Sequence, residues 1–517
     1  MPAAFLPRTV LALAASAAVA LGAGCGDDGA SGSSGPDPAA ALPATAPLYV
    51  EAQVSPGGDL ADNVKAVSRK LLGTEDVGQK VVGLIDDQLG ERGASYEKDI
   101  APWLGQRAGV ALTALGGRDA DGVAAIVSKD DDKAKAYIDA RPQTEQREYR
   151  GVAYRVKAAD DEAAAIIDHT VLFGTEAGVK SAIDATKGNA LADAKAFKEA
   201  RDAIGTDGLG FFYMDPGRTF AAALGAASRA GASQAQMLQG ALTGTGLRSI
   251  AGRLDVASDA LRADVAVLGA KRQTPAGGDA AAAAAAVPAD AWLSVGVGDV
   301  GAYVQNALKG LGRSGASSGI DPAVLLQQLK AGFGVDVQQD FLSWMGDAAF
   351  FVRGTKPDTV GGGLIVHSKD PAASRRAIGT IDGLLTTFDV AHGPLRGVAG
   401  AEGLEVHLSG VDRPIDIAAK DDRFVVAFGE DALRAALGGG AQLGQSPAFT
   451  QAAGLLGGPK PSLFLNTPSA VALLGAFAGS APGFRNATPT LDALGPLVAG
   501  GEDRDGVTHA EVAIAVR

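Results

Sequence analysis

Two kinds of apolar pattern run along the chain, one with the period of a strand and one with the period of a helix. Residues 48–54 and 292–297 alternate apolar and polar positions, which predicts strands. Short apolar runs predict further strands at 108–113, 123–127, 151–156 and 164–173. Helices are predicted between them at 131–140 and 176–185. In the second half, apolar residues recur at helical spacing after Asp321-Pro322, a favourable helix start: Val324, Leu325, Leu326, Leu329 and Phe333.

The order of these elements predicts an α+β fold. Strands follow one another in pairs, and helices separate the pairs, which favours an antiparallel or mixed sheet with the helices on one face. Asp130 and Asp370 each stand where a strand gives way to a helix, so both are predicted to be N-caps. A dinucleotide-binding fold would need strict β-α-β alternation with a glycine-rich first turn, and the sequence lacks that pattern.

The body of the chain repeats itself. Residues 99–105 read Asp-Ile-Ala-Pro-Trp-Leu-Gly, and residues 340–346 read Asp-Phe-Leu-Ser-Trp-Met-Gly, 241 positions later (344 − 103). Further matches follow in the same order, including Ser-Lys-Asp at 128–130 and 368–370 and Ala-Phe at 196–197 and 448–449. We therefore expect a tandem duplication of one α+β unit, with repeats at 46–270 and 288–517. An alanine-, glycine- and proline-rich linker is expected at 271–287.

The N-terminus has the pattern of a bacterial export signal. Arg8 precedes an apolar run that ends in Gly22-Ala23-Gly24-Cys25, and Cys25 is the only cysteine of the chain. We expect a signal peptide at 1–24 and lipidation of Cys25 by acyl chains such as palmitate. The position three residues before the cysteine is Gly22, where lipoprotein signals usually carry leucine. The alternative is cleavage after Ala18-Val19-Ala20, which would leave Cys25 as a free thiol.

A flexible tether is expected at 25–45, because Gly, Ser, Pro and Asp dominate the segment without apolar periodicity. The rest of the chain is globular in composition, with 47% hydrophobic and 20% charged residues. The formal net charge is −13, and removing residues 1–24 takes away one arginine and no acid, giving −13 − 1 = −14. This charge argues against nucleic acid or anionic lipid headgroups as partners.

No motif for catalysis, a cofactor or a metal is found. His169, His367, His392, His407 and His509 lack a second histidine or cysteine at ligand spacing. A Walker motif is absent from the sequence, and the glycines at 361–363 precede a predicted strand, which argues against a phosphate site. The acids at 130–132 lack the spacing of an EF-hand loop and are interpreted as a solvated helix start. Trp103 and Trp344 could form a ligand platform, but a buried anchor fits their repeated turn better.

These features resemble a known family. The opening Pro-Ala-x-Ala-x-Leu-Tyr-Val (43–50), the Asp-x-x-x-Trp-x-Gly element and the duplicated arrangement are similar to the exported bacterial lipoproteins, of actinobacterial type, grouped as domain of unknown function 3352. The resemblance covers about residues 46–517. It implies an exported or lipid-anchored protein and brings no catalytic residues.

Three functions remain open from the sequence. The first is a non-enzymatic lipoprotein that is held by its lipid anchor at the outer face of the cytoplasmic membrane and binds an envelope protein or a hydrophobic ligand. The second is a structural or assembly factor of the envelope. The third is a hydrolase with an unrecognised site. An apolar cavity would favour a carrier, whereas an exposed apolar patch on a solid core would favour partner binding.

Overall fold

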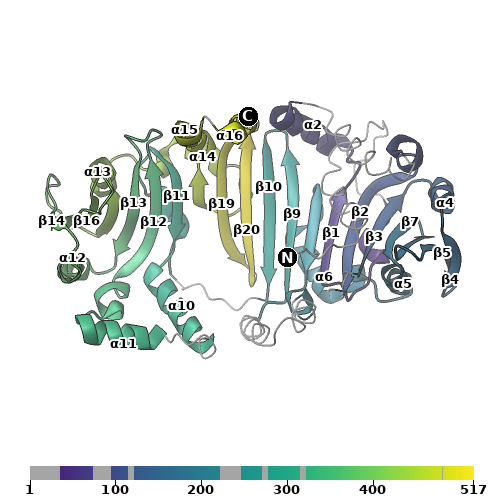
Figure 1. Ribbon diagram of the computed structural model, residues 1–517, viewed down its shortest axis with the longest axis horizontal. Helices are drawn as coiled ribbons and strands as arrows, with labels where there is room; N and C mark the ends of the chain where they lie inside the picture. The colour runs from purple at the N-terminus through teal and green to yellow at the C-terminus, as the bar shows by residue number, and fades with distance from the viewer. Residues whose placement is uncertain are drawn as a thin grey trace. The chain divides into compact units, whose positions relative to one another are not determined.

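The computed structural model describes residues 35–73, 95–114, 121–219, 221, 246–269, 277–314, 322–479 and 481–517. The predicted signal peptide and Cys25 lie outside these residues. The chain divides into two compact units (Figure 1). Unit 1 comprises Met1–Lys271 with Asp503–His509 and Val516, and unit 2 comprises Arg272–Glu502 with Ala510–Ala515 and Arg517.

The strands of unit 1 form an antiparallel sheet in the order β4-β5-β6-β7-β3-β2-β1-β8-β9-β10. The first strand therefore lies inside the sheet, between β2 and β8. The strands are β1 (Leu48–Gln53), β2 (Leu104–Ala114), β3 (Asp121–Ser128), β4 (Glu145–Tyr149), β5 (Val152–Lys157), β6 (Glu162–Ile167), β7 (Thr170–Thr175), β8 (Gly210–Met214), β9 (Ser249–Ala257) and β10 (Ala260–Leu268).

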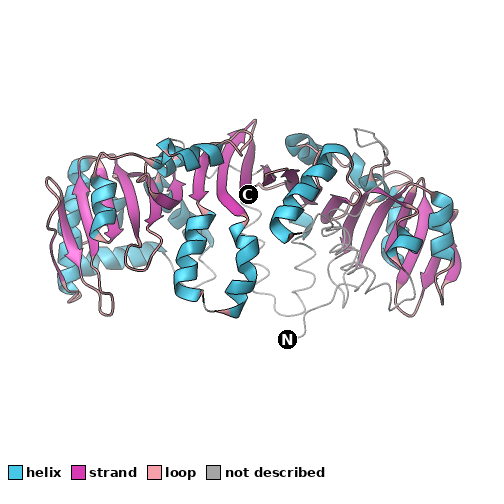
Figure 2. Cartoon of the chain, turned by 90° about the horizontal axis from the view of Figure 1, so that it is seen from above, coloured by secondary structure: helices cyan, strands magenta, loops and turns pink. Residues whose placement is uncertain are grey.

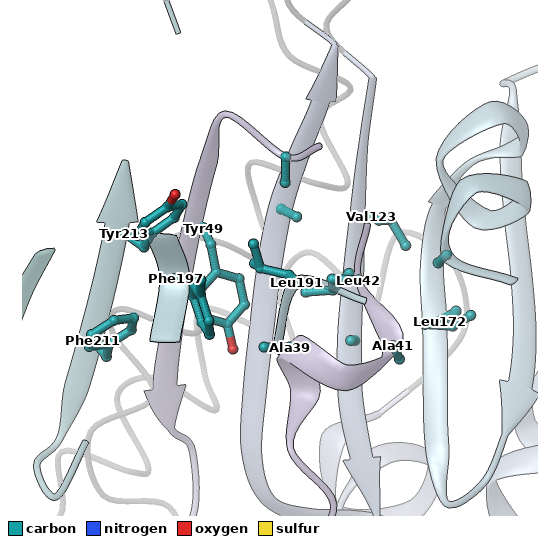
Figure 3. Packing of buried hydrophobic residues seen from close by; sticks show 14 of the residues in the cluster. Ala39, Ala41, Leu42, Tyr49, Val123, Leu172, Leu191, Phe197, Phe211 and Tyr213 are labelled. Atoms are coloured by element: carbon teal, nitrogen blue, oxygen red, sulfur yellow. The ribbon is translucent and has the colours of Figure 1, made fainter. Parts of the chain in front are cut away.

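Helical segments cover both faces of this sheet, so the expectation of helices on one face is wrong. One face packs against η1 (Pro38–Ala41), α5 (Glu176–Ala185), η3 (Leu191–Asp193) and α6 (Lys195–Ile204), around Tyr49, Phe197 and Phe211 (Figure 3). The other face packs against α2 (Gly58–Leu72), the π-helix η2 (Tyr96–Ile100) and α4 (Asp131–Asp139). Strand β3 is buried along both faces, which is why its apolar run is continuous instead of alternating.

Unit 2 has the strand order β14-β15-β16-β17-β13-β12-β11-β18-β19-β20, again antiparallel in every described register. Replacing each strand by its number within the unit gives the same order as in unit 1. The strands are β11 (Ala291–Val297), β12 (Met345–Arg353), β13 (Gly361–Ser368), β14 (His392–Pro394), β15 (Glu402–Val406), β16 (Ile415–Lys420), β17 (Arg423–Phe428), β18 (Pro461–Leu465), β19 (Leu494–Arg504) and β20 (Val507–Val516).

Helices also lie on both sides of the strands of unit 2 (Figure 2). One face is covered by α9 (Ala280–Ala285), α13 (Glu430–Leu437), η6 (Leu443–Gln445) and α14 (Pro447–Ala453). The other carries α10 (Val300–Ser314), the π-helix η5 (Val337–Leu342) and α12 (Pro371–Thr387), with α11 (Pro322–Phe333) against η5. The remaining helices are α15 (Thr467–Ala478) and α16 (Pro482–Asp492), which precede β19.

The repeated tryptophan element has the same local structure in both units. Trp103 and Trp344 are 1% and 0% exposed, as expected for buried anchors. Each follows a π-helix and donates its indole N–H to a carbonyl four residues back, that of Asp99 or Asp340, at 2.7 Å. The predicted N-caps Asp130 and Asp370 are confirmed, since each side chain accepts backbone N–H groups of the following helix.

Two expected boundaries are displaced, because apolar residues near them are buried. The expected tether, 25–45, extends too far: residues 37–45 pack on unit 1, where Ala39 and Leu42 are fully buried. We call residues 37–46 the strap. The expected linker, 271–287, is also too long, because Asp279 caps α9 and Ala284 and Val287 are buried in unit 2. The single strand expected at 164–173 is a hairpin of β6 and β7, turned at Asp168-His169 with positive φ at both residues.

Candidate functional site

The residues that could suggest catalysis or metal binding have ordinary structural surroundings. His169 lies in the β6–β7 turn and pairs with Asp131 at 2.8 Å, and His367 pairs with Asp422 at 3.3 Å. His392 contacts the Val390 carbonyl and Asp382. Among the described residues, no group of three His, Cys, Asp or Glu side chains is placed to hold a metal ion.

The glycines at 361–363 lie within strand β13 instead of before it. A Cβ atom at Gly362 would lie 2.3 Å from the carbonyl oxygen of Phe351, and one at Gly363 would lie 2.5 Å from that of Val426. The neighbouring strands therefore require glycine at these positions, and the run has a packing role.

The most unusual surface among the described residues is helix α15. Its 12 residues carry no charge, and its sequence, Thr-Pro-Ser-Ala-Val-Ala-Leu-Leu-Gly-Ala-Phe-Ala, is apolar around most of its circumference. Such helices are normally buried. Yet only Thr467 is buried among residues 467–477, and Leu474 and Phe477 are 54% and 66% exposed. Helix α13, shorter by four residues (12 − 8), buries four of its side chains.

The local sequence explains why this segment is a helix although it is poorly packed. The Asn466 side chain accepts the N–H of Ser469, and Pro468 lies within the first turn, where it needs no hydrogen bond. Gly479 ends the helix, and Pro482 begins α16. The two helices contact each other through Gly475 and Phe484, where a Cβ atom on the glycine would lie 3.6 Å from the ring. Figure 1 shows α15 and α16 beside the C-terminal strands of unit 2.

Charge is absent well beyond α15. No residue from Thr467 to Phe484 is charged, and Arg485 is the first that is. We call residues 467–484 the apolar hairpin segment. It combines exposed aliphatic and aromatic side chains with no charged group, the kind that resists transfer to an apolar medium most strongly. Among the described residues, no helix is both long enough and apolar enough to cross a membrane.

A second unusual group is a pair of carboxylates in unit 2. Glu405 on β15 and Asp416 on β16 lie directly opposite each other. Asp416 is 2% exposed, and its Oδ2 atom has no hydrogen-bond partner among the described residues. Burial, and then the charges of Glu405 and Glu430, raise the pKa of Asp416 to about 6. When Ser128 of β3 is aligned with Ser368 of β13, the strand registers place Val156 at the position of Glu405 and Ala163 at the position of Asp416. The matching pair in unit 1 is therefore apolar.

Comparison with known proteins places the chain in a family. The model of the family described as "Protein of unknown function (DUF3352)" matches residues 8–495. The chain belongs to the DUF3352 family. No curated protein matches it. Similar solved structures include crystal form I of TP0453, with 9% identity over 46% of this chain and 81% of that one, and crystal form III, with 10% identity over 47% and 83%. Both have a TM-score of 0.26.

The strap of this DUF3352 chain is fixed by an ion network in unit 1. Glu51 is 8% exposed. Its carboxylate accepts hydrogen bonds from Arg107 Nε at 2.6 Å, from Arg201 Nη2 at 2.8 Å and from the Tyr49 hydroxyl at 2.7 Å. Arg201 also forms an ion pair with Asp37, the first residue of the strap. Burial, together with the nearby carboxylates, raises the pKa of Tyr49 well above its ordinary value. These charges compensate one another, so the network serves as a structural clamp.

The ion network has no sequence motif, since Asp37, Glu51, Arg107 and Arg201 are far apart in the chain. Glu405 and Asp416 are only eleven positions apart (416 − 405), but they face each other only because of the register of β15 and β16. The apolar hairpin segment is readable as an apolar run, but its exposure is not, because the same composition suits a core helix. Cys25, the one site residue expected from the sequence, lies outside the described residues.

Proposed function

We propose that the chain is an exported, non-enzymatic lipoprotein that is anchored through Cys25 and binds a hydrophobic partner at the cell envelope. The observation that carries the proposal is helix α15, which has no charged residue and on which Leu474 and Phe477 are 54% and 66% exposed. Exposed apolar side chains gathered on one uncharged helix are typical of a surface that binds a hydrophobic partner. The supporting sequence features are the signal-like N-terminus and Cys25 behind it.

We further propose that the two units arose by tandem duplication. The common strand order and the matching tryptophan elements support this. The described parts of the two units differ in their polar groups. Unit 1 has the ion network, whereas unit 2 has the carboxylate pair, which is replaced by Val156 and Ala163 in unit 1.

The pairing of one carboxylate in unit 1, Glu176, is consistent with the non-enzymatic assignment. Glu176 accepts hydrogen bonds from Tyr154 at 2.7 Å and from Arg147 at 3.0 Å, and it pairs with Lys180 at 2.8 Å. Hydrogen bonding to Lys180 first, and then to Tyr154, lowers the pKa of Glu176 to about 2. Such fixed pairing holds a carboxylate in its charged form and suits a structural role better than proton transfer near neutral pH.

The anchor is tested by isolating the chain from a bacterial host that processes lipoproteins. We expect the mature chain to begin at Cys25, with a mass that includes acyl groups, and to stay with membranes through an alkaline carbonate wash. The Cys25→Ser variant should be released by that wash, because two acyl chains hold a protein stably where weaker contacts do not. A native chain that begins at Leu21 without acyl mass would overturn the proposal.

A further inference from the structure

We propose that the apolar hairpin segment (residues 467–484) inserts its exposed side chains into the lipid bilayer, as a second membrane contact besides the anchor. This inference rests on the proposed function and names the hydrophobic partner. Leu474 and Phe477 are more than half exposed although both lie on a well-formed helix. The described residues cover less than half of each side chain, so an apolar phase outside the protein must cover the rest if it is to be removed from water.

The distribution of residues around α15 favours lipid over a protein groove. A helix that docks in a protein groove presents one apolar stripe and keeps polar residues on its other face. In α15 the residues after Ser469 are all Ala, Val, Leu, Gly or Phe, so each side of the helix can enter an apolar medium. The bilayer is the partner that can surround such a helix without requiring polar contacts.

The distribution of charge also favours the bilayer as the partner and indicates that the contact is hydrophobic. The whole segment lacks charged residues, and the mature chain would carry a net charge of −14 (−13 − 1). Attraction to anionic headgroups therefore cannot drive the contact. Insertion must depend on the hydrophobic effect, so it should not require anionic lipid and should be insensitive to salt on neutral vesicles.

The strap limits how far unit 1 can lie from the lipid anchor. Because residues 37–46 are part of unit 1, only residues 26–36 lie between Cys25 and the strap, which is eleven residues (36 − 25). Eleven extended residues span about 40 Å. The proposed lipid anchor would therefore keep the start of unit 1 within a few tens of ångströms of the bilayer.

The length of α15 limits the depth of insertion. Twelve residues make a helix of about 18 Å, shorter than the hydrocarbon core of about 30 Å. The segment therefore enters one leaflet from the outside. Arg485 follows it directly and would remain at the headgroup level.

The test uses the mature Cys25→Ser chain, which has neither anchor nor cysteine, and vesicles of phosphatidylcholine alone. We expect the chain to float with the vesicles, and a Leu474→Ser/Phe477→Ser variant to partition at least about tenfold more weakly, because two large apolar side chains are lost from the lipid. The matched control is Phe388→Ser, since Phe388 is 60% exposed but lies at the end of α12. Its partitioning should change less than twofold.

A second measurement locates the segment directly. A dye attached to Phe477→Cys in the Cys25→Ser chain should shift to the blue with vesicles and be quenched by spin-labelled lipid tails, whereas the same dye at Phe388→Cys should do neither. Failure of the parent chain to float, equal loss in the Phe388→Ser control, or binding that requires phosphatidylglycerol would each overturn the inference. The mass of the native chain would still report on the lipid anchor independently.

Discussion

Replacing Asp416 with asparagine tests the energetic effect of the buried carboxylate pair in unit 2. The side chain is 2% exposed and faces the carboxylates of Glu405 and Glu430, with His407 the one group that favours its charged form. Its pKa rises from an ordinary 3.8 to about 6, and at 1.36 kcal/mol for each pH unit this shift is about 3 kcal/mol. Ionised Asp416 therefore destabilises the folded state by up to about 3 kcal/mol at neutral pH.

The sign of the pH dependence follows from proton binding. Between the unfolded and folded pKa values, the folded state holds the proton more often than the unfolded state does, so the free energy of unfolding falls as pH rises through this window. The destabilisation is complete above about pH 6 and absent below about pH 4. Asp416→Asn, which cannot ionise, should stabilise unit 2 by as much as about 3 kcal/mol near pH 7.5 and by almost nothing near pH 4. The amide still lacks a partner, so this value is an upper limit.

Hydrogen exchange read peptide by peptide in increasing urea measures this effect, because peptides from β15 to β17 report on unit 2 separately from unit 1. Asp431→Asn is the matched control, since that carboxylate is 90% exposed and only 3.6 Å from Arg434 in a surface pair. The control should change stability by less than about 1 kcal/mol at either pH. A stabilisation by Asp416→Asn that is equal at both pH values, or a loss of stability near pH 7.5, would refute the reasoning.

Three other substitutions probe features of the fold. Trp344→Ala should destabilise unit 2 by about 3–5 kcal/mol, because the substitution leaves a cavity at a fully buried site. The same hydrogen-exchange method measures this loss, and a change below about 1 kcal/mol would contradict the role of Trp344 as a buried anchor. Arg201→Ala leaves buried Glu51 with one fewer partner and removes one of the two ion pairs of Asp37, which keeps only the longer contact with Arg107. Limited proteolysis should therefore cut within residues 37–46 more readily than in the parent chain. Glu176→Gln should lower the free energy of unfolding by about 1 kcal/mol at neutral pH, because the stabilising charge of Glu176 is present above pH 4.5 and lost as pH falls through about 2. An effect that is undiminished near pH 2 would contradict the role of the ion pair with Lys180.

The sequence predicted local elements well where the signal was local. The strands at β1, β2 and β3, the helices α4 and α5, and the N-caps Asp130 and Asp370 were all readable from short patterns. The two-sided covering of the sheet was missed, although the unbroken run at 123–127 is typical of a strand buried on both faces. The strap was missed because Ala39 to Leu42 is a short apolar stretch inside a Gly-, Ser- and Pro-rich region.

The candidate site could not be predicted from the sequence, for a different reason. Composition shows that α15 is apolar, but only the arrangement of its neighbours determines whether its side chains are covered. Asp416 occupies an inward position of a strand where its counterpart, Ala163, is apolar. That contrast can be recognised only after the strand registers of the two units are known, because the acid itself fits an ordinary alternating strand.

The interior position of β1 has a consequence for how unit 1 is made. Strand β1 is the first strand among the described residues, but it pairs with β2, where Leu48 lies opposite Leu112, and with β8, where Leu48 lies opposite Met214. Until residues near 214 are present, β1 has one open edge, and open edges invite pairing with other chains. Contacts between residues so far apart close late and slow folding. A chain that is synthesised from its N-terminus would thus hold this edge of β1 open until the residues of β8 have been made.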